Sequence, residues 1–208
     1  MTQAAELPAL YVWIGGRSLG QDAIQSIESV VIGQSLCSPS YCELRFVQQQ
    51  FLPFGNIRQG DSVIIAVDNK SNRLFEGDIT AAEHQYAAGG DQKLVIRAYD
   101  LLHRLRKRQE IRQFANTKLS SLVADVVRNI NAKVAWHGSN KPITQSYQWR
   151  QSDLAMITEN CQRYGHHFFL WDNKLHVFPL SSGFKPKGRR KRLRWMKNLV
   201  GANVELNA

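Results

Sequence analysis

The segment Leu94–Ile111, LVIRAYDLLHRLRKRQEI, passes from a strand pattern to a helical pattern with no Gly or Pro between the two. In residues 94–99 apolar side chains alternate along an extended run. Asp100 follows directly and is suited to cap a short helical turn, because its carboxylate can accept hydrogen bonds from free N–H groups. We therefore predict a rigid junction that ends one domain and starts the next. In this turn we expect Leu101, Leu102 and Leu105 to point inward and His103, Arg104, Arg106 and Lys107 to point outward.

Upstream of this junction, the sequence reads as a series of strands. Short apolar-alternating runs such as ALYVWIGG, YCELRFVQ and KLVIRAY are separated by turn residues between Leu10 and Tyr99. The long run RLFEGDITAAEHQY contains Gly77, which suits a bulge or a bend. About half a dozen antiparallel strands at this spacing predict a small barrel or sandwich, and we expect a β-barrel domain over residues 1–105.

Downstream, apolar residues recur at helical spacing. Asn116 or Thr117 can cap a helix whose apolar stripe is Leu119, Leu122, Val123, Val126 and Ile130. A connector containing Pro142 leads to a second helix, capped by Ser152 and stopped by Gly165. Asp172-Asn173 then separates two short apolar runs, as in a tight hairpin. Residues 106–182 therefore form an α+β domain with two helices and a β-hairpin, and the predicted fold class is α+β, mostly β.

Residues 183–208 are expected to hold a basic linker and the start of a further strand or second barrel. The net charge is +10, and eight Lys or Arg with no acidic residue fall between Lys185 and Lys197. Such a run binds phosphates, acidic protein surfaces or anionic lipid, or is simply solvated. The candidate basic interaction surface is Lys185, Lys187, Arg189, Arg190, Lys191, Arg192, Arg194 and Lys197.

The common signatures of catalysis, nucleotide binding and calcium binding are missing from the sequence. We therefore expect no catalytic residues, no cofactor and no metal site. His166-His167 beside Cys161 is not favoured as a metal site, because adjacent strand residues point to opposite faces. An acid/base pair of Asp100 and His103 is weighed against a structural role in the turn, which we favour.

Three cysteines, Cys37, Cys42 and Cys161, show neither disulfide-framework nor zinc spacing, so we expect reduced and mostly buried thiols. No apolar run is long enough for a membrane span, and the first residues do not resemble a secretory signal. These features favour a cytosolic origin of the chain.

The runs LFEGDITAAEHQY and LVIRAYDLLHRLRKRQEIRQFANTKLSSLVADVV resemble the phage late control gene D protein family. That family includes baseplate hub proteins of contractile phage tails and the N-terminal part of VgrG-type spike proteins. Its signature of a small residue, Tyr-Asp and a basic His-Arg-Leu turn is matched by Ala98, Tyr99, Asp100, His103, Arg104 and Leu105. The later run YQWRQSDLAMITENCQRYGHHFFLWDNKLHVF is similar to the family's capped helix and hairpin, and the resemblance extends from Leu10 to Leu206.

The resemblance implies a structural hub without enzymatic activity, which joins the tail tube to the central spike. Its implied partners are copies of itself in a homotrimer, the tube protein, the spike protein and other baseplate proteins, in a virion tail or injection-system baseplate. The family usually supplies two related barrels, whereas this sequence stops at NLVGANVELNA, where a second barrel would begin. The chain is then a fragment, a reduced hub, or a subunit whose missing barrel comes from a partner chain.

Two other functions are weighed. A nucleic-acid-binding module acting through residues 185–197 would show an affinity that falls steeply with salt. A wall-degrading enzyme would need a recognisable pair of carboxylates, and the sequence does not show one.

Overall fold

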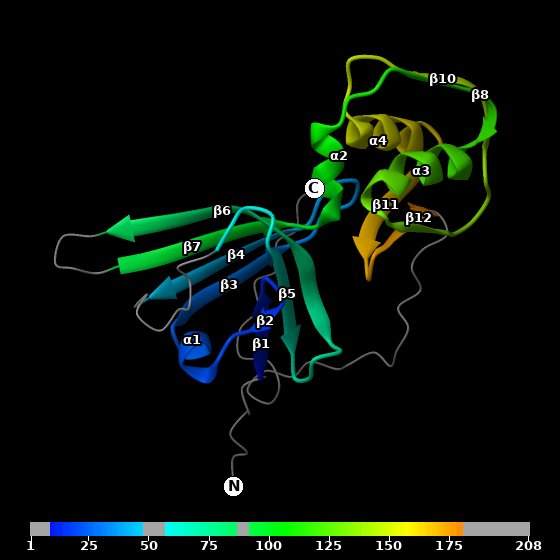
Figure 1. The fold of residues 1–208 in the computed structure, drawn as a ribbon. Helices are drawn as coiled ribbons and strands as arrows, with labels where there is room; N and C mark the ends of the chain where they lie inside the picture. Colours follow the sequence, from blue (N-terminus) through cyan, green and yellow to red (C-terminus); the bar gives the residue numbers. More distant parts are fainter. Residues whose placement is uncertain (1–8, 48–56, 87–91, 181–208) are drawn as a thin grey trace, which may run out of the picture.

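The computed structural model of the chain describes residues 9–47, 57–86 and 92–180. Two lobes are arranged end to end, a curled sheet and a smaller lobe built from helices and short sheets (Figure 1). The fold is mostly β, as expected. The basic surface at residues 185–197 and the terminal strand expected from Asn198 lie outside the described residues.

The first lobe is one sheet of seven strands, in the order β2-β1-β5-β6-β7-β4-β3, and neighbouring strands are antiparallel. Its order leaves β2 and β3 at opposite ends, so the described strands form a curled half-barrel (Figure 1). The five-residue helix α1 (Gln21–Gln25) precedes β3. The strands are β1 (Leu10–Ile14), β2 (Arg17–Ser18), β3 (Ile27–Gly33), β4 (Tyr41–Val47), β5 (Ser62–Val67), β6 (Arg73–Tyr86) and β7 (Gln92–Tyr99).

The long strand β6 is irregular on both sides of Gly77. Its pairing with β5 shifts register between Ile65 and Ala66, and its pairing with β7 shifts beyond Ile79. At Gly77 itself, a Cβ atom would lie 2.2 Å from the carbonyl oxygen of Tyr99. The glycine therefore serves a close approach of the two backbones, and the bends lie beside it.

The second lobe holds a three-stranded sheet, a two-stranded ribbon and two packed helices. Its sheet has the order β11-β12-β9, with β9 parallel to β12, and the ribbon pairs β8 with β10. The turn residues Asp172 and Asn173 both have positive φ, which confirms the tight hairpin. The elements are β8 (Arg112–Lys118), α3 (Leu119–Val127), η3 (Arg128–Ile130), β9 (Lys133–Trp136), β10 (Pro142–Gln148), α4 (Asp153–Arg163), β11 (His166–Trp171) and β12 (Lys174–Pro179).

Two details of the predicted helices are corrected. Asn116 and Thr117 do not cap α3, because they lie in β8, where Thr117 pairs with Ile143. The first N–H groups of α3 instead donate to the loop that precedes Pro142. Leu119 donates to the carbonyl oxygen of Lys141, at 2.9 Å, and Ser120 donates to the Asn140 side-chain oxygen, at 3.1 Å. The expected connector with Pro142 is strand β10. The capping of α4 by Ser152 is confirmed.

Each lobe has its own apolar core. The first is formed by residues of the curled sheet, among them Val12, Leu44, Phe46 and Ile96. The second joins α3, α4 and the three-stranded sheet, and it also contains Leu102 and Leu105 from the turn that follows β7. The chain thus enters the second core within three residues of the end of the first sheet. The exact division at residues 105 and 106 stays a prediction.

Candidate functional site at the junction of the two lobes

Asp100 lies buried at the end of β7 and caps the turn as expected. Its Oδ1 accepts a hydrogen bond from the Leu102 N–H at 3.0 Å, and its Oδ2 accepts one from the Ser40 N–H at 2.9 Å. Burial raises the pKa of the carboxyl, although the hydrogen bonds from Ser40 and Leu102 oppose that shift. One side chain therefore fixes both the 3₁₀ turn η2 (Leu101–His103) and the loop before β4.

Arg104 begins helix α2 (Arg104–Lys107) and turns back onto the first lobe. Its Nε and Nη2 donate to the two oxygens of Asp78 on β6 at 2.7 and 3.0 Å, a bidentate pair that fixes direction as well as distance. Its side chain is half exposed, in line with the predicted outward position, while the guanidinium is held by Asp78. The arginine therefore ties the turn after β7 to the neighbouring strand.

His103 was expected to point outward, but its side chain is only 11% exposed. Its Nδ1 lies 2.7 Å from the carbonyl oxygen of Asp100, and its Nε2 lies 3.8 Å from Asp78. The imidazole thus contacts the backbone of Asp100, whose carboxylate is used for capping. Both ring nitrogens of His103 therefore face groups of the junction. This geometry supports a structural role of His103 in the turn rather than an acid/base role.

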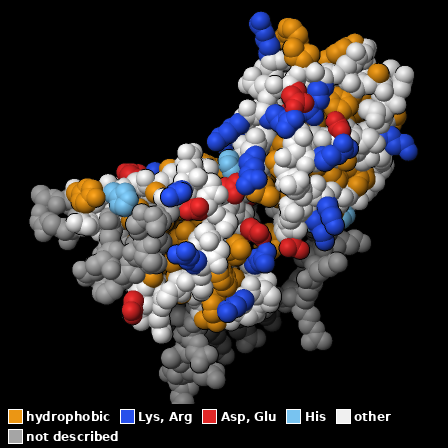
Figure 2. Space-filling view, viewed as in Figure 1, with side chains coloured by type: hydrophobic (Ala, Val, Ile, Leu, Met, Phe, Trp, Pro, Cys, Tyr) orange, Lys and Arg blue, Asp and Glu red, His pale blue; other side chains and the backbone are white. Residues whose placement is uncertain are grey.

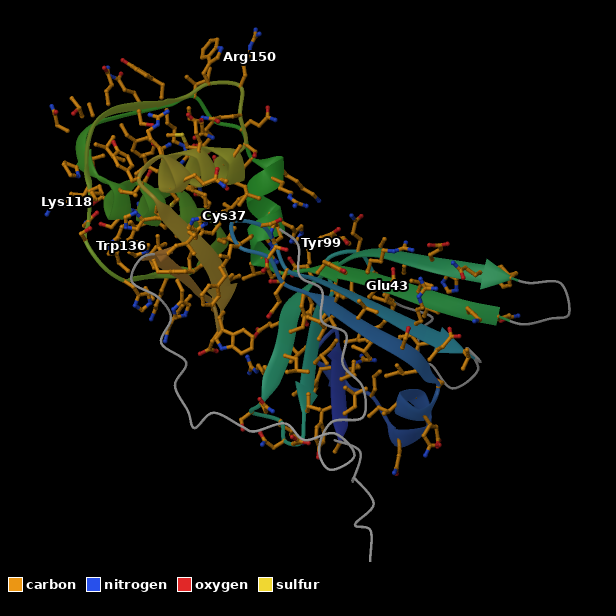
Figure 3. All side chains as sticks on the ribbon, turned by 180° about the vertical axis from the view of Figure 1, so that it is seen from behind. Cys37, Glu43, Tyr99, Lys118, Trp136 and Arg150 are labelled. Carbon is orange, nitrogen blue, oxygen red and sulfur yellow. The ribbon has the colours of Figure 1, made fainter. Side chains whose placement is uncertain are left out.

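The loop that precedes β4 reaches across to the second lobe. The Cys37 N–H donates to the carbonyl oxygen of Phe168 on β11 at 2.8 Å, and the Thr158 hydroxyl on α4 donates to the Cys37 carbonyl at 3.5 Å. The Cys37 sulfur lies 3.8 Å from Nδ1 of His167. Figure 3 shows Cys37 against the second lobe and Tyr99 at the end of the curled sheet that faces it. Two separate chain segments therefore bridge the lobes, which opposes hinge motion.

The outer face of the curled sheet carries a ladder of alternating charge. Arg97 on β7 donates to Glu43 on β4 and to Glu83 on β6, each at 2.9 Å, and Arg45 also pairs with Glu43. The arginine hydrogen bonds lower the pKa of Glu43, with Arg45 contributing most. Because these groups are exposed, the pairs add little stability and are available as polar contacts on a broad surface.

Beside this ladder, Tyr41 and Tyr99 lie with ring centroids 6.5 Å apart, and the Arg106 guanidinium lies 5.7 Å from the Tyr99 centroid. The five junction residues Tyr99, Asp100, His103, Arg104 and Leu105 are thus brought together, with Leu105 in the second core. Whether these residues have a functional role beyond the fold stays a prediction.

The histidines considered for metal binding diverge. Both ring nitrogens of His166 face backbone carbonyl oxygens, of Tyr164 at 2.9 Å and of Ser139 at 3.2 Å, whereas His167 faces Cys37. Over residues 9–47, 57–86 and 92–180, no cluster of three His, Cys, Asp or Glu could hold a metal ion.

A cleft of about 640 Å³ separates the β5–β6 turn of the first lobe from η3 and the β11–β12 turn of the second. Asp100 and Arg104 reach its wall, but both are committed to the junction. These two side chains are therefore engaged in structural contacts within the junction.

The sequence analysis missed a buried polar network under the ribbon. Asp153, at the start of α4, is fully buried and accepts hydrogen bonds from Arg112 and Gln148. The available signal was the alternation at the start of RQFANTK, where Arg112 and Phe114 are partly buried and Gln113 and Ala115 are exposed, but it does not identify a partner.

These observations describe a mostly β scaffold in which two lobes are joined rigidly by buried hydrogen bonds and by a shared entry into the second core. A family model for the phage tail baseplate hub (GPD) matches residues 34–205, and the chain belongs to this family. A search of curated proteins finds no match. None of the helices in the described parts of the chain is long and apolar enough to cross a membrane.

Solved structures show the same fold at low sequence identity. The 43 kDa tail protein of prophage MuSo2 from Shewanella oneidensis has a TM-score of 0.67 at 15% identity, with 82% of this chain and 54% of that chain covered. The tail protein from Neisseria meningitidis MC58 has a TM-score of 0.65 at 14% identity, with 82% of this chain and 51% of that chain covered. A third structure is an E. coli component of the type VI secretion system, described as similar to T4 tail proteins. It has a TM-score of 0.59 at 14% identity, with 76% of this chain and 50% of that chain covered. The chain thus spans about half the length of these proteins.

Proposed function

We propose that this chain is a structural component of a baseplate hub and joins the tail tube to the central spike of a contractile phage tail or related injection system. The observation that carries the proposal is the match to the baseplate hub family over residues 34–205, which includes most of the first lobe and all of the second. The hub acts through binding surfaces and has no catalytic step.

The rigid junction supports this role. A hub transmits load between stacked rings, so its two lobes must keep one orientation while their outer surfaces bind neighbours. Three sets of contacts hold the junction: the hydrogen bonds of Asp100, the Arg104–Asp78 pair, and the hydrogen bond from Cys37 to Phe168 of the second lobe. The broad outer face of the curled sheet, with its charge ladder, offers the flat area that ring stacking requires.

The proposed partners are further copies of the chain in a homotrimer, the tube protein, the spike protein and other baseplate proteins. Assembly takes place in the bacterial cytoplasm, before the particle is released or the apparatus fires.

Light scattering on the purified full chain, at low and high salt and with and without nuclease, tests self-assembly. A trimer whose mass is the same at both salts supports the hub. A chain that is monomeric at both salts contradicts trimerisation of these 208 residues on their own. An assembly that nuclease or salt dissolves contradicts the proposal and favours nucleic acid binding.

The second candidate function is nucleic-acid binding, and the eight Lys or Arg between Lys185 and Lys197 favour it. It predicts single-strand or duplex binding whose affinity falls steeply between low and physiological salt. Replacing Arg189, Arg190, Lys191 and Arg192 with Gln would abolish binding. Equal binding by this variant, or an affinity independent of salt, would rule the candidate out.

A further inference from the structure

At the end of the ribbon where Arg112 pairs with Gln148, the inner face of β8 and β10 is polar and the outer face carries large apolar side chains, the reverse of a sheet at the surface of a soluble protein. Arg112, Ser146 and Gln148 point toward helix α4, and the last two are buried. Ile111, Tyr147 and Trp149, at the same end of the ribbon, are exposed. Figure 1 shows the ribbon along the outer margin of the second lobe, with α4 beneath it.

Polar contacts with helix α4 hold the inner face at this end of the ribbon. Arg112 Nη2 lies 2.9 Å from both carboxylate oxygens of Asp153, and Gln148 Nε2 donates to Asp153 at 2.8 Å. Farther along, the Ser146 hydroxyl donates to Asn160 at 2.9 Å. Because Asp153 and Asn160 are both buried on α4, these bonds fix which face of the ribbon points outward.

The apolar residues on the outer face form one group. Gln148 pairs with Arg112, so Trp149 lies across from Ile111, and Tyr147 pairs with Gln113 beside them. Their exposed fractions are 76% for Ile111, 56% for Tyr147 and 62% for Trp149. The outward positions in the segments 111–115 and 145–149 carry no charge: they are Ile111, Gln113, Ala115, Gln145, Tyr147 and Trp149. We name these six residues the ribbon face. A grouped, uncharged, aromatic surface on a strongly basic chain is typical of a binding site.

Basic residues surround the ribbon face. The segments 108–118 and 141–150 hold four exposed basic residues, Arg108, Lys118, Lys141 and Arg150, and one acidic residue, Glu110, while Arg112 points inward to Asp153. Glu110 is already paired with Arg108 and Arg112. Arg150 lies with its guanidinium carbon 5.7 Å from the Trp149 ring centroid, and Figure 3 places it at the upper edge of the second lobe. Two copies of this rim facing each other would repel, whereas a carboxylate-rich surface would be attracted.

We propose that the ribbon face is a docking surface for a different protein of the assembly, one whose contacting surface has an apolar centre and a rim of Asp and Glu. Tyr147 and Trp149, with Arg150 stacked beside Trp149, supply the residue types that dominate binding energy at protein interfaces. The inference rests on the proposed hub function, because it places the partner within the tail or injection apparatus. It assigns the outer end of the second lobe to a neighbour, away from the curled sheet.

Site-specific photocrosslinking in assembled particles tests this inference. The photoreactive residue p-benzoylphenylalanine is placed at the position of Tyr147 and, in a second strain, of Trp149. The matched control is the position of Tyr86, which is 72% exposed at the end of β6 on the other lobe. Particles are irradiated after purification, and crosslinked peptides are identified by mass spectrometry.

We expect both ribbon positions to crosslink to one different protein, at a peptide in which Asp or Glu flanks an apolar residue, and the control position not to reach that peptide. Crosslinks only between copies of this chain, or to a peptide without acidic residues, overturn the inference. So does a lack of crosslinks in particles that contain the chain. If the unmodified chain is absent from purified particles, the hub function itself is overturned.

The identified partner then gives a quantitative check. Trp149→Ala should weaken its binding to the full chain by about tenfold or more, as for a central aromatic residue of an interface. Arg150→Glu should weaken binding most at low salt, because the lost attraction is electrostatic. Tyr86→Ser should leave the affinity unchanged. Equal affinities for the wild-type chain and Trp149→Ala would overturn the proposal.

Discussion

At the scale of single residues, Asp100 decides whether the turn after β7 holds its shape. It accepts one hydrogen bond from within the turn and another from the Ser40 backbone, which comes from a distant part of the chain. Asp100→Ala would leave two buried N–H groups without partners, so we expect it to lower the free energy of unfolding by about 1–3 kcal/mol. Asp100→Asn keeps an acceptor oxygen and should cost less. Urea denaturation of the three proteins measures both effects, and an Ala variant as stable as the wild type would contradict this role.

The three thiols differ in accessibility. Burial raises the pKa of both Cys42 and Cys161 to about 12, whereas Cys37 is half-buried and its pKa is raised less far. Since the thiolate is the reactive form, we expect slow modification of Cys37 alone in the folded protein at pH 8, and of all three on unfolding. Titration with a chromogenic disulfide reagent measures this, with Cys37→Ser as the control that removes the native-state reaction. Rapid reaction of two or more thiols before unfolding would disagree with the structure.

At the scale of elements, the ribbon depends on the buried contact between Arg112 and Asp153. Asp153 is fully buried, so Arg112→Met would remove its nearest cationic partner and leave only Arg108, at 3.7 Å, to balance the carboxylate; it should lower the free energy of unfolding by about 3 kcal/mol. The double variant Arg112→Met with Asp153→Leu should recover most of that loss, because neither charge then remains buried.

An exposed pair on the same helix provides the comparison for this effect. Arg163 and Glu159 are both about half exposed on α4, and Arg163→Ala should change stability by about 0.5 kcal/mol or less. Chemical denaturation of the four proteins separates the two cases. If the double variant is no more stable than Arg112→Met, the buried charge is not the cause of the loss.

Elements with a strong local signal were predicted from the sequence. The strand runs, the Ser152 cap and the Asp172-Asn173 hairpin all depend on residues close together in the chain. Strand β8 was missed because its sequence, RQFANTK, is mostly polar, and its inward side chains are matched by residues of α4 that lie far along the chain. The start of α3 was misassigned for a related reason: its first N–H groups are capped by Lys141 and Asn140 from a distant loop.

The junction shows the same limit. The cap at Asp100 is local and was predicted, whereas the burial of His103 depends on Asp78, which lies on a different strand. The pairing of Arg104 with Asp78 is also nonlocal. The pattern of the turn therefore predicted that the arginine side chain points outward, but it did not predict its partner. The basic segment at residues 185–197 stays a sequence-based prediction.

At the scale of the whole molecule, the two cores are connected by contacts that come from both directions. The turn after β7 places Leu102 and Leu105 in the second core, while the loop before β4 binds Phe168 through Cys37. Separating the lobes therefore requires breaking Asp100, Arg104 and Cys37 contacts together, in addition to exposing apolar surface. Such coupling is what makes two cores unfold as one unit.

We therefore expect calorimetry of the full chain to show one unfolding transition, in which the van't Hoff and calorimetric enthalpies agree. The double variant Asp100→Ala with Arg104→Ala removes the cap and the bidentate pair with Asp78, and it should split the transition into two, with one lobe melting first. Arg163→Ala, which removes an exposed pair distant from the junction contacts, should keep a single transition. Two transitions already present in the wild-type chain would mean that the lobes are independent, and the hub would then need neighbouring subunits to hold their orientation.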